Sequence, residues 1–119
     1  MKDADAIVGA LRRILAPYEP RLHVTASAPE NFHLETAHVA TLGKPVYFGG
    51  VRRGKSYVSF YLMPIYVCPD LVKRVSPALR KRMQGKSCFN FKQVEPELFA
   101  ELKTLTKRSF ERFRKEGYV

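Results

Sequence analysis

The sequence predicts an α+β fold in which an antiparallel β-sheet has N- and C-terminal helices packed on it. Segments near both chain ends repeat apolar residues with the period of an α-helix, and the segments between them alternate apolar and polar residues as strands do. The order is helix, several strands, short helix, strand and helix, which is typical of α+β proteins rather than of repeated βαβ units. With 119 residues, the chain has the length of a single domain, residues 1–119.

The N-terminal helix is predicted to follow an N-cap at Asp3 or Asp5 and to end at Pro17 and Pro20. Its apolar residues share one stripe: Ile7, Val8, Leu11, Ile14 and Leu15. Two half-exposed strands should follow at residues 21–26 and 32–35, with a turn at 29–31 between them. We expect a further break at residues 42–45, where Gly and Pro interrupt the pattern.

A β-hairpin is predicted in the middle of the chain. Residues 46–51 and 57–63 are apolar runs, and Arg52-Arg53-Gly54-Lys55 between them is a turn sequence. The second run reads Tyr-Val-Ser-Phe-Tyr-Leu-Met and is bulky on both faces. We therefore expect it to be a central strand with both faces covered.

The last third of the chain predicts a short helix, a short strand and a long helix. Ser76-Pro77 is an N-cap followed by proline at the first helical position, and Gly85 stands where a left-handed residue can end a helix over 77–84. A strand should contain Cys88, Phe89 and Phe91, with Cys88 on the face opposite the two phenylalanines. The last helix begins at Pro96. Its apolar stripe consists of Leu98, Phe99, Leu102, Leu105, Phe110 and Phe113.

The positive charge is confined to the middle of the chain. The chain carries 21 basic and 11 acidic residues, a net charge of +10, and its pI is about 9.9. Residues 44–94 contain all of this excess, since their only acidic residue is Asp70. A basic surface attracts anions, so this segment is the candidate binding region.

Three basic clusters and two tyrosines make up the candidate binding face. The clusters lie at the hairpin turn, around the short helix and beside the short strand. The candidate residues are Arg52, Arg53, Lys55, Tyr57, Tyr61, Arg80, Lys81, Arg82, Lys86 and Lys92. If they converge, the face suits a nucleic acid or another polyanion, because tyrosines stack on bases. The alternative is a scattered cationic surface that only keeps the protein soluble. The sequence contains no RNP-type aromatic motif, GXXG loop or helix-turn-helix pattern.

Motifs for catalysis, metals and cofactors are weak. Gly85-Lys86-Ser87 is no P-loop, because Arg80 stands where the first glycine belongs. His23, His33 and Glu35 could in principle form a two-His, one-carboxylate metal site, but their spacing does not require one. We therefore predict no catalytic residue, no metal and no cofactor, and expect the domain not to be an enzyme.

The predicted environment is the cytoplasm. No stretch reaches 18 apolar residues, and the first residues lack the pattern of a signal peptide, so we expect no membrane association. Cys68 and Cys88 form no CxxC pair and are expected to be reduced, mostly buried thiols. A protein partner is the other class of partner that this composition allows.

Three stretches resemble the YdhG-like family of small bacterial domains, most of which have no assigned function. They are Tyr57-Val58-Ser59-Phe60-Tyr61-Leu62-Met63-Pro64, Met83-Gln84-Gly85-Lys86-Ser87-Cys88-Phe89-Asn90-Phe91 and Glu95-Pro96, and the resemblance spans about residues 44–115. It implies a compact α+β domain with a bent antiparallel sheet. Some relatives resemble frataxin, which implies iron handling. Frataxin-type iron binding needs an acidic ridge, but the first helix carries Arg12 and Arg13, so no metal ligands are carried over.

The sequence thus leads to one main hypothesis and two alternatives. The main one is a non-catalytic module that binds an anionic partner, a nucleic acid or another polyanion, through residues 44–94. The first alternative is a frataxin-like intracellular iron-handling protein, and it rests only on the resemblance. The second is a small-ligand pocket lined by Tyr57, Tyr61 and Phe91.

Overall fold

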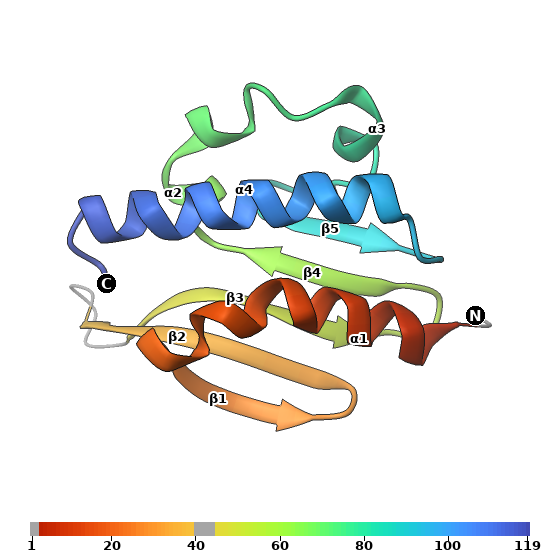
Figure 1. Cartoon of the computed structure of the whole chain (residues 1–119), viewed down its shortest axis with the longest axis horizontal. Coiled ribbons are helices and arrows are strands. Elements are labelled where there is room, and N and C mark those ends of the chain that lie inside the picture. Colours follow the sequence, from red (N-terminus) through yellow and green to blue (C-terminus); the bar gives the residue numbers. More distant parts are fainter. Residues whose placement is uncertain (1–2, 40–44) are drawn as a thin grey trace.

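The computed structural model describes residues 3–39 and 45–119. Its five strands form one antiparallel sheet in the order β1-β2-β3-β4-β5, so that each strand pairs with its neighbour in sequence (Figure 1). The strands are β1 (His23–Ala28), β2 (Asn31–Val39), β3 (Pro45–Arg53), β4 (Val58–Leu62) and β5 (Cys88–Phe91). Most of the break predicted at 42–45 lies outside the described residues.

The two long helices cover one face of this sheet. In Figure 1, α1 (Ala4–Leu15) and α4 (Pro96–Lys115) lie side by side in front of the strands. A 3₁₀ helix, η1 (Ala16–Arg21), connects α1 to the sheet. The predicted α+β fold, an antiparallel sheet with N- and C-terminal helices packed on it, is therefore confirmed.

An excursion of short helices separates β4 from β5. It contains α2 (Pro64–Val67), η2 (Pro69–Val72) and α3 (Pro77–Arg80), and it packs against α4 beyond the β5 edge (Figure 1). Ser76 caps α3 as predicted: its hydroxyl accepts a hydrogen bond from the Leu79 amide at 3.1 Å and donates one to Glu101 of α4 at 2.6 Å. Arg112 of α4 also binds both carboxylate oxygens of Asp70 through its two terminal guanidinium nitrogens. These contacts fix the excursion against the last helix.

The core is a layer of apolar side chains between the sheet and the two long helices. Strand pairing places Phe32, Val51, Phe60 and Phe89 in one row across β2, β3, β4 and β5, and all four are almost completely buried. Residues of α1 and α4 close over this row. They are Ile7, Leu11 and Leu15 from α1 and Phe99, Leu102, Leu105, Phe110 and Phe113 from α4.

The expectation that both faces of β4 are covered is wrong. Val58, Phe60 and Leu62 face the core, whereas Ser59 and Tyr61 face the side without helices. Tyrosine is bulky but amphipathic, so it can occupy a solvent-facing position with its ring against neighbours and its hydroxyl in water. The strand is interior as predicted, flanked by β3 and β5, but helices cover one face only; on the other face Ser59 is buried among its neighbours and Tyr61 is half-buried.

One predicted helix end is confirmed and one differs from the structure. The α-helix α1 ends at Leu15, shortly before Pro17, and Pro17 and Pro20 lie in the 3₁₀ helix η1 that follows. The helix predicted over 77–84 ends at Arg80. The next residues leave it because their backbone pairs with β5: Arg82 O accepts from Asn90 N at 2.8 Å, and Gln84 N donates to Cys88 O at 2.9 Å. Gly85 has a positive φ of 75°, as predicted, in the turn that follows.

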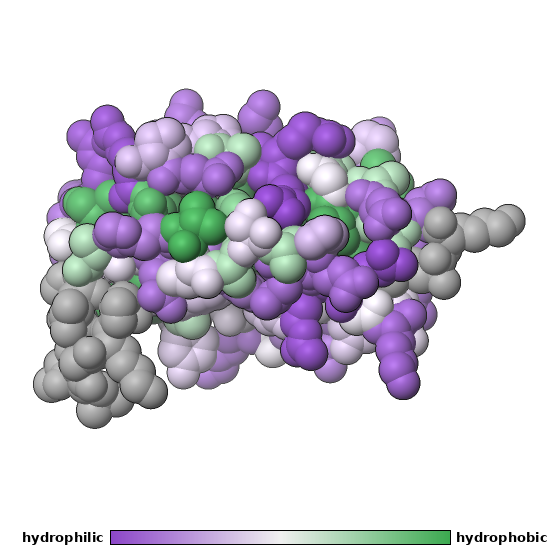
Figure 2. Space-filling view, turned by 90° about the horizontal axis from the view of Figure 1, so that it is seen from below, coloured by the Kyte–Doolittle hydropathy of each residue, from purple (hydrophilic) through white to green (hydrophobic). Residues whose placement is uncertain are grey.

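The two edges of the sheet differ. Residues 82–84 cover the outer edge of β5, whereas β1 is a free edge strand whose Val24 is 44% exposed. Seen from the β1 side, the surface is mostly hydrophilic with apolar patches between (Figure 2). No helix within the described ranges combines the length and hydropathy needed to cross a bilayer.

The first prediction concerns the core row. Phe60→Ala should lower the free energy of unfolding by about 3–5 kcal/mol, because the lost ring leaves a cavity in a tightly packed layer. Urea denaturation followed by circular dichroism measures this, with Val24→Ala on the free edge as the control that changes stability by less than about 0.5 kcal/mol. A loss below about 1 kcal/mol for Phe60→Ala would contradict the central role of this row.

Candidate functional site

The sheet face without helices, called the open face below, carries polar and aromatic side chains in two rows. One row crosses β2, β3, β4 and β5 through Asn31, Arg52, Ser59 and Asn90. The next row crosses the same strands through His33, Gly50, Tyr61 and Cys88. Strand alternation explains this composition, because the neighbours of these residues along each strand face the core.

A hydrogen-bonded chain of three side chains occupies the β2–β3 part of the open face. His33 Nε2 lies 2.5 Å from Asn31 Oδ1, and His33 Nδ1 lies 2.6 Å from the Tyr47 hydroxyl. Since the carbonyl oxygen of Asn31 only accepts, Nε2 carries the proton and Nδ1 accepts from Tyr47. A side chain at Gly50 would collide with His33 and Tyr47, so this arrangement requires glycine there.

Burial fixes the protonation state of these groups. Desolvation, and then the positive charge of Arg52, lower the pKa of His33 below its usual value of 6.5. Desolvation raises the pKa of Tyr47, so its hydroxyl keeps its proton. The imidazole is therefore neutral at neutral pH, and the three side chains act as a polar wall rather than as a charge.

A second hydrogen-bonded group lies on β4 and β5. The Ser59 hydroxyl donates to Asn90 Oδ1 at 2.7 Å, and the Cys88 thiol lies 3.4 Å from the same oxygen. Asn90 Nδ2 donates to Gln84 Oε1. Desolvation raises the pKa of Cys88, which keeps the thiol protonated and unsuited to nucleophilic attack.

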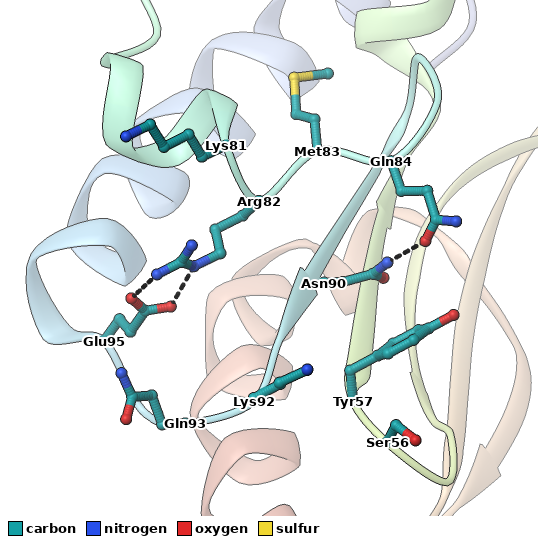
Figure 3. A pocket seen from close by; sticks show the side chains of 10 residues that line it. All are labelled: Ser56, Tyr57, Lys81, Arg82, Met83, Gln84, Asn90, Lys92, Gln93 and Glu95. Atoms are coloured by element: carbon teal, nitrogen blue, oxygen red, sulfur yellow. Dashed lines mark hydrogen bonds and ion pairs between the residues drawn. The ribbon is translucent and has the colours of Figure 1, made fainter.

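Three adjoining hollows cross this side of the molecule. The first, about 780 Å³, lies between Tyr57 and the segment 81–84 (Figure 3). It shares Ser56 and Tyr57 with the second, of about 280 Å³, which shares Arg52 and Tyr61 with the third, of about 490 Å³. The three hollows therefore adjoin one another in series from the α3–β5 segment to β2, and this series is called the groove below.

The groove is positively charged. Arg52, Lys55, Lys81 and Lys92 line it, and within residues 3–39 and 45–119 none of them has an ion-pair partner. Arg82 is different, since its guanidinium binds both oxygens of Glu95 at 2.6 and 2.7 Å. That pair lowers the pKa of Glu95 through the hydrogen bonds from Arg82. It also ties the end of the excursion to the start of α4 (Figure 3).

The structure brings seven of the ten predicted residues together and places three elsewhere. The residues that line the groove are Arg52, Lys55, Tyr57, Tyr61, Lys81, Arg82 and Lys92. Arg53 instead forms an ion pair with Asp5 of α1 at 2.9 Å. Arg80 and Lys86 line another, apolar hollow beside α2, which shares only Met83 with the first hollow. Phe91, expected beside Tyr57 and Tyr61 in a ligand pocket, is fully buried against Phe99.

Sequence reasoning missed the uncharged part of the groove. His33, Tyr47, Gln84 and Asn90 line it without belonging to any basic cluster. The alternation of β2, β3 and β5 could have placed three of them on one face, but only the strand register brings them next to one another. The sequence predicts that Gln84 lies in a helix, so no pattern in the sequence indicates that it contacts β5.

Within the described ranges, no three His, Cys, Asp or Glu side chains lie close enough to hold a metal ion. Cys68 and Cys88 are both free thiols. No family model matches the chain, and no curated protein or solved structure matches it significantly.

The second prediction follows from the environment of His33. Because its pKa is lowered in the folded state, the unfolded chain binds the proton more readily below the reference value of 6.5. The contribution of His33 to stability is therefore complete above about pH 6.5 and decreases as the pH falls below it. An NMR titration of the His33 ring should give a midpoint below 6.5. A midpoint above 6.5 would contradict the hydrogen-bond assignment.

Proposed function

We propose that the open face binds single-stranded nucleic acid. The observation that carries this proposal is the series of adjoining hollows that tyrosines and unpaired cations line together. Tyr57 borders the first two hollows, Tyr61 the second and third, and Tyr47 the third. An extended chain of bases and phosphates has this alternation of flat rings and negative charges.

The tyrosines favour a single strand over a duplex. An aromatic side chain stacks on a base only when the base face is uncovered, and in a duplex the bases cover one another. Tyr57 and Tyr61 are half-buried, Tyr61 in β4 and Tyr57 immediately before it in the hairpin turn, where its carbonyl accepts a hydrogen bond from Gly54 N at 2.9 Å. Stacking of this kind tolerates many sequences, since every base has a π-face.

The cations supply the electrostatic part of binding. Lys81 and Lys92 line the first hollow, Lys55 lines the second, and Arg52 lines both the second and the third. Cations in all three hollows suit a strand that runs along the groove, with several phosphates in contact. Each phosphate contact to a single strand contributes about −0.7 to the slope of log K against log salt concentration.

The test is binding of a fluorescent 12-nucleotide single-stranded DNA of mixed sequence, measured by anisotropy at several salt concentrations. We expect a slope near −3, because four unpaired cations line the groove and each contact adds about −0.7. Lys92→Gln should make the slope less negative by about 0.7, and Tyr57→Ala should weaken binding by about 1–3 kcal/mol.

Matched controls separate the groove from general charge. Lys103→Gln on the exposed side of α4 should leave the slope unchanged, and Tyr66→Ala, whose tyrosine is 56% exposed outside the groove, should leave the affinity unchanged. Heparin is a polyanion without bases, so the affinity of the chain for heparin should not change with Tyr57→Ala. Salt-independent binding, or equal effects of Lys92→Gln and Lys103→Gln, would contradict the proposal.

A further inference from the structure

Two carboxamide side chains at the wall of the first hollow are hydrogen-bonded to each other. In the structure the Ser59 hydroxyl donates to the oxygen of Asn90, and the amide nitrogen of Asn90 is directed toward Gln84. That nitrogen donates to Gln84 Oε1, which leaves the nitrogen of Gln84 at the outer end of the pair. Figure 3 shows the three atoms in this order: Asn90 nitrogen, Gln84 oxygen and Gln84 nitrogen.

These atoms offer a row of three hydrogen-bonding positions. Asn90 Nδ2 has a second N–H, Gln84 Oε1 has a second lone pair, and Gln84 Nε2 has its own N–H groups. None of these positions has a protein partner among the residues that the structure describes. The row therefore reads donor, acceptor, donor.

Only one type of base edge complements this row at all three positions. The Watson–Crick edge of uracil or thymine reads acceptor, donor, acceptor through O4, N3–H and O2. Cytosine offers donor, acceptor, acceptor, and guanine offers acceptor, donor, donor, so each leaves at least one mismatch. Adenine offers only a donor and an acceptor. Single-stranded binding proteins can read these edges because the bases are unpaired.

We propose that the first hollow selects a uracil or thymine base from the bound strand, an inference that rests on the nucleic-acid binding proposed above. The volume of about 780 Å³ lies within the range of ligand sites and exceeds what one pyrimidine needs. Tyr57 borders the same hollow and supplies the ring for stacking, and the Lys92 side chain extends along it (Figure 3). The base edge meets Gln84 and Asn90.

The test compares 12-nucleotide oligo(dT) and oligo(dC), which have bases of the same size. The wild-type chain should bind oligo(dT) about 5- to 150-fold more tightly, the range for a well-formed base contact. Gln84→Ala should reduce this ratio to about 1 while binding of oligo(dC) changes little. Gln93→Ala is the matched control, because Gln93 lines the same hollow away from Asn90 and should keep the preference.

A modified base distinguishes recognition of the base edge from an effect of the different flexibility of oligo(dT) and oligo(dC). Replacing thymine by N3-methylthymine removes the central donor of the base edge. The wild-type chain should therefore bind the methylated oligonucleotide no more tightly than oligo(dC). Gln84→Ala should cause no further loss of affinity for the methylated oligonucleotide. Equal affinity for oligo(dT) and oligo(dC) would overturn the base selection and leave the proposed function standing. Failure of every oligonucleotide to bind would overturn both.

Discussion

Burial on one side only of the sheet is the constraint on which the rest of the structure depends. The row of Phe32, Val51, Phe60 and Phe89 holds one face of four strands against α1 and α4. Because side chains alternate along a strand, the same register places the neighbouring polar residues together on the other face. A slip of one residue would exchange the two sets, so the packing energy of the core also fixes the geometry of the groove.

The excursion between β4 and β5 completes the groove. Residues 81–84 supply four of the side chains that line the first hollow, next to those of Asn90 and Lys92. Three contacts with α4 and its N-cap residue hold this segment: Ser76 with Glu101, Asp70 with Arg112, and Arg82 with the N-cap residue Glu95. Arg82 therefore stabilises the wall of the hollow through its ion pair with Glu95. The neighbouring Lys81 has no ion-pair partner among the described residues, so its charge is available to a ligand.

The sequence predicts the fold well where a pattern has one interpretation. The hairpin, the last helix and the placement of Cys88 opposite Phe89 and Phe91 follow from periodicity, and the structure confirms them. The prediction that both faces of β4 are covered is wrong. Tyr61 is as bulky as a core residue, and only the residues that surround it in the fold show that it faces the side of the sheet without helices. The groove itself could not be predicted, since it depends on register and on the contact of Gln84 with β5.

The most direct test of the central claim is an NMR titration of the labelled chain with a 12-nucleotide single-stranded DNA at about 50 and 200 mM salt. Our account predicts amide shifts at Tyr57, Tyr61, Asn90 and Lys92, weaker at the higher salt concentration because phosphate contacts release counterions. Amides on the exposed side of α4, such as that of Lys107, should not move. Shifts confined to the helical side, or none at either salt concentration, would contradict binding on the open face.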